Sequence, residues 1–280
     1  MHDVKAPTES LTQGEKSEGV YVYCFADSVL RSLTERKGVD GQHTLFPRRF
    51  EDVTAVASMV SLEEFCGPSA EPRMQDLSWV GPRACRHEEV VEEVMRCSPV
   101  LPARFGTIFS SLDKLDEALK EHHDAISRFL GWVADKEEWG VKGFLDRTKA
   151  KNELFSAAVA AKADRLSSSP GMRYFEEQRI RTEVEKELAS WVKMVCKGVG
   201  DDLRSLASEW RERKVSSGSV SGAETVVNWA FLVPRNVTAD FRARIDRANG
   251  EHGGRGLVFD MTGPWPPYSF CPSLEKESER

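Results

Sequence analysis

The side chains that could support catalysis or metal binding include six cysteines and six histidines. The cysteines are Cys24, Cys66, Cys85, Cys97, Cys196 and Cys271. No two of them have the spacing of a zinc knuckle or of a redox pair. Cys24 lies in an apolar strand pattern and Cys196 on an apolar helix face, so we expect both to be buried free thiols. Cys85, between Arg83 and Arg86, is the only candidate for a lowered thiol pKa.

The histidines form no recognisable motif. His122 and His123 are adjacent, so on a helix they point about 100° apart and cannot chelate one metal ion together. The sequence His87-Glu88-Glu89 resembles the start of a zinc-protease motif, but position 91 is valine. We expect these histidines to be solvated helical residues.

Other catalytic signatures are missing from the sequence as well. The glycine-rich stretch 250–256 lacks the Lys-Ser/Thr of a phosphate loop and precedes a strand instead of opening a helix. There is no Gly-x-Ser-x-Gly nucleophile elbow. We therefore predict that the protein is not an enzyme and holds no metal or cofactor.

Composition and charge exclude further classes of protein. The 280 residues are 40% hydrophobic and 30% charged, which suits a globular protein of about two domains. No run approaches the roughly 18 apolar residues that cross a bilayer, and residues 1–19 lack the apolar segment of a signal peptide. The 39 basic and 45 acidic residues give a net charge of −6, which disfavours nucleic-acid binding because that needs basic surface.

The hydrophobic pattern of the first half predicts the order β-α-β-β-α-β. The expected elements are strands at 20–25, 44–48, 53–60 and 100–105, and helices starting at Asp27 or Ser28, starting at Ser61, and over 82–96 and 111–133. Residues 67–76 are expected to form a loop, because they contain two prolines and a glycine. Pro102 places its strand at a sheet edge. This order is that of a ferredoxin-like antiparallel sheet.

The second half predicts the order β-α-α-β-α-β. The expected elements are strands at 139–145, 226–233 and 257–261, and helices over 152–166, over 172–213 and from Thr238. Gly198 and Gly200 are expected to interrupt the longest helix. The almost wholly apolar strand 226–233 is expected to be central in its sheet or covered on both faces.

We therefore predict an α+β protein of two domains, an N-terminal modified ferredoxin-like sandwich and a C-terminal α+β domain with an enlarged helical part. The expected boundaries are a flexible leader at 1–18, the N-terminal domain with its long transition helix at 19–135, the C-terminal domain at 136–263, and a Pro/aromatic tail at 264–280.

Four sequence blocks stand out together. They are LPARFGTIF at 101–109, EEWGVK at 137–142, FLVP at 231–234 and TGPWPPYSF at 262–270. In this order and at this spacing they resemble the GvpF/GvpL family of gas vesicle proteins. The resemblance covers about residues 19–271, and it implies two α+β domains and no catalytic residues.

The resemblance also implies a function. It is that of a minor, cytoplasmic gas vesicle protein that is required for vesicle formation, binds the apolar shell protein GvpA and assists its assembly or nucleation, with other gas vesicle proteins as further partners. Such a helper has a physical reason, because exposed apolar strands aggregate unless an apolar groove or a sheet edge holds them. The alternative is a small-molecule-sensing α+β module, which would have an apolar pocket with convergent polar groups. A hydrolase or transferase would need a nucleophile–base pair, which the sequence does not show.

The candidate residues for partner binding or for a domain junction come from these blocks. They are Arg104, Phe105, Glu138, Trp139, Pro264, Trp265, Pro267, Tyr268 and Phe270. Arg104 would reach a partner's carboxylate or pair within the fold with Glu138, and Trp139 would be a core or a contact residue. Gly106 is expected to have a positive φ. Three prolines make the tail an extended strap, whose aromatic residues either pack over the domain junction or dock a shell subunit.

Overall fold

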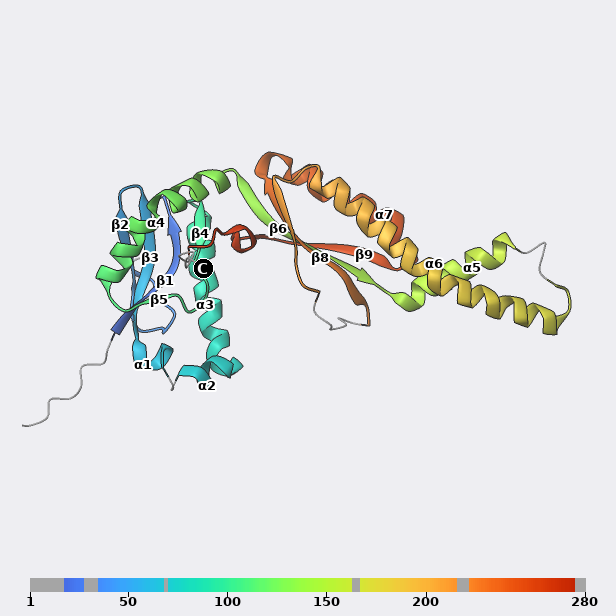
Figure 1. Ribbon diagram of the computed structural model, residues 1–280, viewed down its shortest axis with the longest axis horizontal. Coiled ribbons are helices and arrows are strands. Elements are labelled where there is room, and N and C mark those ends of the chain that lie inside the picture. The colour runs from blue at the N-terminus through green and yellow to red at the C-terminus, as the bar shows by residue number, and fades with distance from the viewer. Residues whose placement is uncertain (1–17, 28–34, 68–69, 163–166, 216–221, 275–280) are drawn as a thin grey trace, which may run out of the picture. The chain divides into compact units, whose positions relative to one another are not determined.

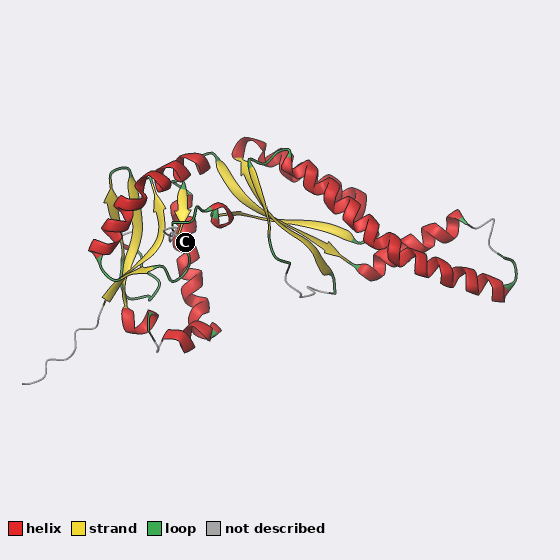
Figure 2. Cartoon of the chain, in the orientation of Figure 1, coloured by secondary structure: helices red, strands yellow, loops and turns green. Residues whose placement is uncertain are grey.

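The computed structural model describes residues 18–27, 35–67, 70–162, 167–215 and 222–274. Residues 1–17 of the predicted leader and the helix predicted after Asp27 or Ser28 lie outside these residues, and Glu18 is the first residue of a strand. The chain divides into two compact units, Met1–Leu130 with Leu274–Arg280, and Gly131–Ser273. Each unit contains an antiparallel sheet with helices (Figures 1 and 2), which confirms the predicted α+β class.

The sheet of the first unit has the strand order of a ferredoxin-like fold. Its strands are β1 (Glu18–Ala26), β2 (Leu45–Phe50), β3 (Val53–Ser61), β4 (Val100–Pro102) and β5 (Ile108–Phe109). The order is β2-β3-β1-β4, all antiparallel, and the short β5 also pairs with β1. Strands β2 and β3 form an antiparallel hairpin. Strand β4 lies at the end of this path, where Pro102 removes no hydrogen bond from the ladder.

The helices of the first unit differ from the prediction between residues 67 and 82. They are α1 (Leu62–Phe65), α2 (Ala70–Gln75), α3 (Leu77–Met95) and α4 (Leu112–Val133). The predicted loop is wrong because Pro72 stands in the first turn of α2, where a helix needs no backbone N–H donor. Helix α3 begins at Leu77, five residues before Pro82. Its N-cap residue is Asp76, whose carboxylate accepts a hydrogen bond from the Ser78 amide.

The second unit repeats the strand order of the first. Its strands are β6 (Lys136–Leu145), β7 (Glu209–Glu212), β8 (Glu224–Pro234) and β9 (Leu257–Trp265). The order β7-β8-β6-β9 is antiparallel throughout, so its strands, counted along the chain, are ordered second, third, first, fourth as in the other sheet. The predicted central strand is β8, and β9 forms an edge.

The longest helix corrects the prediction for residues 172–213. The helices of this unit are α5 (Arg147–Ala161), α6 (Pro170–Arg204) and α7 (Thr238–His252). Helix α6 runs through Gly198 and Gly200 without a break, and the last residues of the predicted helix form β7 instead. Gly200 is buried against the Trp229 indole, and a Cβ there would lie 3.3 Å from the ring. A glycine at this position therefore lets the helix approach the sheet closely.

The two helical glycines should respond in opposite ways to the same substitution. Gly200→Leu should destabilise the protein by about 1–3 kcal/mol, because the new side chain overpacks the helix–sheet contact. Gly198→Leu should be neutral or stabilising by up to about 1 kcal/mol, because nothing lies within 4 Å of its Cβ position and leucine favours helix. Urea denaturation of both variants checks this, and equal effects would contradict the packing role of Gly200.

Candidate functional site

A buried polar cluster joins the EEWGVK block to the tail in the second unit. We call it the tail anchor, formed by Glu138 on β6, Arg213 just after β7, and Ser269 in the short turn Tyr268–Phe270. The Ser269 amide donates to Glu138 Oε2 at 2.9 Å, and the Ser269 hydroxyl donates to Glu138 Oε1 at 2.9 Å. The Arg213 guanidinium bonds to the same carboxylate and to the Ser269 hydroxyl.

The anchor has an electrostatic asymmetry. The side chain of Glu138 is 1% exposed, whereas that of Arg213 is 35% exposed. Burial raises the pKa of Glu138 above its ordinary value, and the Ser269 and Arg213 donors oppose that rise. Arg213 is therefore the cation that makes a charged carboxylate tolerable at this depth.

The anchor fixes the start of the tail and presents one aromatic side chain. Pro266, Pro267 and Phe270 are buried, and Tyr268 is half-buried. Trp265, at the end of β9, keeps 39% of its surface exposed, and its Nε1 donates to Thr262 Oγ1 at 3.2 Å. The neighbouring Pro264, which follows a cis peptide bond, is also exposed. The tail thus follows directly from β9, which is an edge strand of the sheet.

Of the other candidate residues, Trp139 lies in the core of the second unit, where the Arg242 guanidinium lies 5.5 Å from its ring centre. The predicted pairing of Arg104 with Glu138 is wrong, because the basic partner of Glu138 is Arg213. Sequence reasoning missed Arg213 because it assigned that residue to the end of a helix. The short β7 strand, which brings the arginine beside β8, depends on non-local pairing.

The RFGT block of the first unit is tied to a buried histidine. His87 is 2% exposed, so its predicted solvation is wrong. Its Nε2 lies 3.2 Å from the Ala103 carbonyl oxygen, which can only accept, and its Nδ1 lies 2.9 Å from the Tyr21 hydroxyl. The Gly106 amide donates to the same hydroxyl at 3.1 Å. These contacts select a neutral imidazole with the proton on Nε2.

The surroundings of His87 support that protonation state. Burial lowers the pKa of His87 to about 4. Phe105, the candidate residue beside Arg104, is half-buried with its ring 5.9 Å from the imidazole, whereas Arg104 is exposed. Gly106 has a φ of +86°, as predicted. The block is thus a tight turn packed on the histidine.

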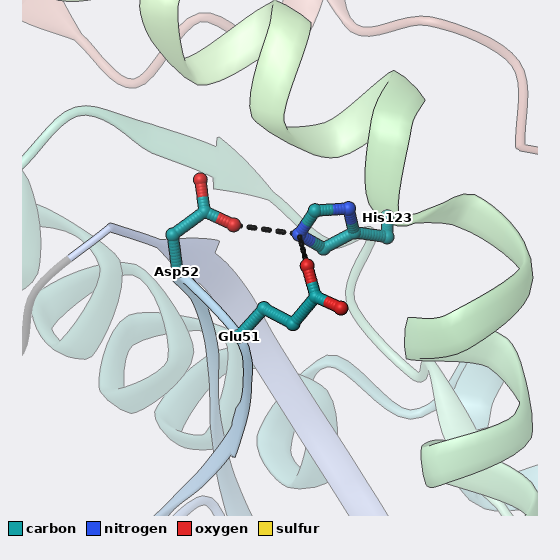
Figure 3. Close-up of side chains that lie close together, drawn as sticks. All are labelled: Glu51, Asp52 and His123. Atoms are coloured by element: carbon teal, nitrogen blue, oxygen red, sulfur yellow. Dashed lines mark hydrogen bonds and ion pairs between the residues drawn. The ribbon is translucent and has the colours of Figure 1, made fainter.

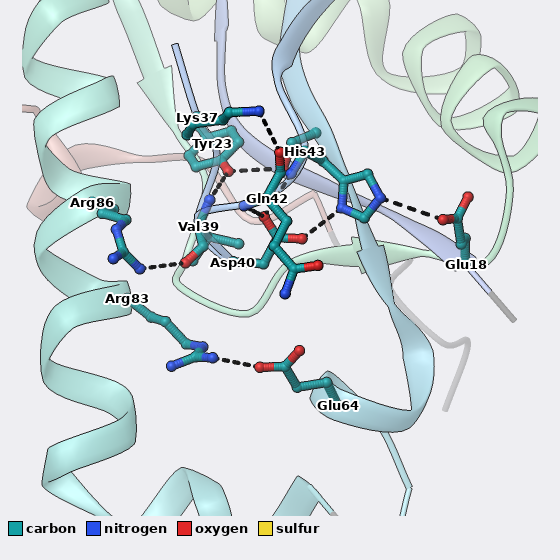
Figure 4. Close-up of polar contacts among 11 residues, drawn as sticks. Glu18, Tyr23, Lys37, Val39, Asp40, Gln42, His43, Glu64, Arg83 and Arg86 are labelled. Atoms are coloured by element: carbon teal, nitrogen blue, oxygen red, sulfur yellow. Dashed lines mark hydrogen bonds and ion pairs between the residues drawn. The ribbon is translucent and has the colours of Figure 1, made fainter. Parts of the chain in front are cut away.

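An open groove of about 790 Å³ lies elsewhere on the first unit. It is lined by Glu18, Asp40, Gln42, His43, Ser61, Glu63, Glu64, Cys66, Arg73 and Trp79. Figure 4 shows polar contacts of its lining, where Asp40 bonds to the His43 imidazole at 2.6 Å and Glu18 lies 3.4 Å from the opposite ring nitrogen. Arg83 pairs with Glu64 at the other end. This polar lining differs from the apolar pocket that a small-molecule sensor predicts.

The fold and the anchor define a class of protein, a tandem pair of split βαβ units whose second sheet carries an anchored aromatic tail. A family model described as "Gas vesicle synthesis protein GvpL/GvpF" matches residues 19–272. Gas vesicle protein L of a Streptomyces species is 25% identical over 233 residues, covering 82% of this chain and 84% of that protein. Gas vesicle protein L2 of Halobacterium salinarum is 26% identical over 290 residues, covering 96% of each.

The fold has a solved counterpart. The crystal structure of GvpF from Anabaena sp. matches with a TM-score of 0.64 at 21% identity, covering 92% of this chain and 97% of that one. The chain belongs to the GvpL/GvpF family, and its role is in gas vesicles. Among the helices that the structure describes, none combines the length and apolar character of a membrane span.

Proposed function

We propose that this protein assists gas vesicle formation by binding the apolar shell protein GvpA and delivering it to the growing wall. Membership of the GvpL/GvpF family supports the process. The proposed binding of GvpA is supported by Trp265, a large aromatic side chain that is partly exposed at the end of an edge strand.

The edge strand β9 offers two kinds of contact to an apolar partner. Val258 is 42% exposed and Trp265 39% exposed, so both can be covered by a second protein. Strand β9 pairs with β6 on one side and ends the order of its described sheet. The Asn249 side chain already bonds to the N–H and C=O of Phe259, so an added strand would pair with the part of β9 beyond Phe259, towards Trp265. A shell subunit with an apolar strand would meet both features.

Trp265 is suited to carry much of the binding energy. Its indole is oriented by Thr262, and the backbone just beyond it is held by the tail anchor, so little side-chain freedom is lost on binding. Tryptophans with these properties are frequent among residues that dominate interface energetics.

Replacing Trp265 with alanine should weaken binding of a GvpA-type shell protein at least about tenfold, because truncating an interface tryptophan removes a dominant contact. A pull-down of the purified shell protein with the full chain measures this. Trp132→Ala is the matched control, since that tryptophan is 37% exposed and lies on α4.

Thermal unfolding separates docking from a structural role. If Trp265 serves the partner, the variant loses binding while its melting temperature stays within a few degrees of the parent. If the variant binds the shell protein as strongly as the parent does, Trp265 is not the docking residue. A parent chain that captures no shell protein, together with normal vesicles after deletion of the protein, would rule out the proposal.

A further inference from the structure

Three side chains of metal-ligating type meet at one end of the first unit (Figure 3). Glu51 and Asp52 form the two-residue turn between β2 and β3, and His123 lies on α4. The His123 Nε2 atom lies 2.6 Å from Asp52 Oδ1 and 3.6 Å from Glu51 Oε2. One ligand atom from each residue lies within 4.8 Å of the others.

We propose that Glu51, Asp52 and His123 bind a divalent transition-metal ion of the zinc type, which links the β2–β3 turn to α4. One imidazole nitrogen and two carboxylate oxygens are ligand types that Zn²⁺ takes, with water completing a tetrahedral shell. Ligand atoms about 2.0–2.2 Å from such an ion lie about 3.3 Å apart. The His123–Glu51 separation is close to this value, and Asp52 needs to move by less than about 1 Å, given the same metal–ligand distances.

The histidine is oriented in the way that metal ligands usually are. Its other ring nitrogen, Nδ1, lies 3.3 Å from the Asp124 carboxylate, and such outer carboxylates fix the tautomer of metal-binding histidines. The His123 ring also packs edge-on against Phe50, with 5.6 Å between ring centres. The nitrogen ligand thus comes from a packed helix, 71 residues from Asp52. Glu51 and Asp52 are 66% and 68% exposed, so packing holds only the nitrogen ligand, and the two carboxylates can turn towards an ion from solvent.

The backbone at Glu51 is a further sign of a role for its side chain. Its φ is +52°, and it is the one non-glycine residue with a positive φ among the described parts of the chain. Turn positions of this kind favour glycine, asparagine or aspartate. Glutamate at this position supplies a longer carboxylate at a conformational cost.

Zinc titration of the metal-stripped full chain tests the site by calorimetry and by thermal unfolding. We expect one Zn²⁺ per chain and a rise in melting temperature, because the ion binds only the folded turn and helix. His123→Gln should weaken binding at least about tenfold and abolish the rise. His122→Gln is the matched control, because its side chain is outside the cluster, and it should bind as the parent does.

Glu51→Gly gives a second test with two readouts of opposite sign. Without metal its melting temperature should rise, because glycine relieves the positive φ, and with zinc the further rise should shrink. No zinc-dependent heat in the parent, or equal binding in parent and His123→Gln, overturns the proposal. Should His123→Gln fail to fold, unchanged zinc binding by Glu51→Gly overturns it. The titration contains no shell protein, so its outcome is independent of the proposed docking.

Discussion

Arg213→Met should destabilise the second unit by about 3–5 kcal/mol, because it leaves the Glu138 carboxylate buried without its cation. Glu138→Gln should lower the stability of the second unit by less than Arg213→Met does. Its amide can still accept from the Ser269 amide, and Arg213, being partly exposed, keeps access to water. Chemical denaturation followed by tryptophan fluorescence measures both changes.

The double variant is the decisive control for the anchor. Glu138→Gln in the Arg213→Met background should recover part of the lost stability, since no unpaired buried charge remains. Arg235→Met, which breaks the neighbouring surface pair with Glu137, should change stability by less than about 1 kcal/mol. If Arg213→Met lowers stability no more than Arg235→Met does, the charge of Arg213 does not stabilise the tail anchor.

His87 alone should lower the stability of the first unit by about 2 kcal/mol between pH 7.5 and pH 5, because it is neutral when folded and protonated when unfolded. Its folded pKa of about 4 lies below the ordinary value of 6.5, so the unfolded state binds more protons between these values. Stability is therefore present above the unfolded pKa, falls as the pH drops from 6.5 towards 4, and levels off below.

Two measurements isolate this contribution. Urea denaturation at both pH values should show a smaller difference in His87→Gln than in His122→Gln. Side-chain NMR of the parent should show the His87 imidazole neutral at pH 5. His123 has the opposite sign, because its bond to Asp52 raises its pKa and adds stability that disappears as the pH rises. Titration of His87 near pH 6.5 in the folded protein would contradict the buried network.

The sequence predicted those parts of the fold that local pattern controls. Strands β1, β3 and β8 have the apolar and β-branched residues that such a pattern detects, and the TGPWPPYSF block identified the tail. The pattern missed β7, because Trp210 falls seven residues after Leu203 and so continues a helical period. Only pairing of Trp210 with Phe231 on β8 makes that segment a strand.

The same physical reason limited the prediction of the site. Glu138 and the tail residues were recognised, but the cation that neutralises Glu138 lies 75 residues away and reaches it only through β7. The buried state of His87 likewise depends on Tyr21 and Ala103, which come from β1 and from the residue after β4. Spacing along one helix carries no information about such partners.

The strand order of the second unit also bears on how the protein is made. All strands of the first sheet are complete by Phe109, so this unit can form its sheet while the rest is still being synthesised. The second sheet cannot form so early, because β6 pairs with β9 and because the buried Glu138 on β6 needs Ser269 as a hydrogen-bond donor. The edge strand proposed to receive a shell subunit is therefore complete only after β9 and the turn that contains Ser269 have been synthesised, long after the first sheet.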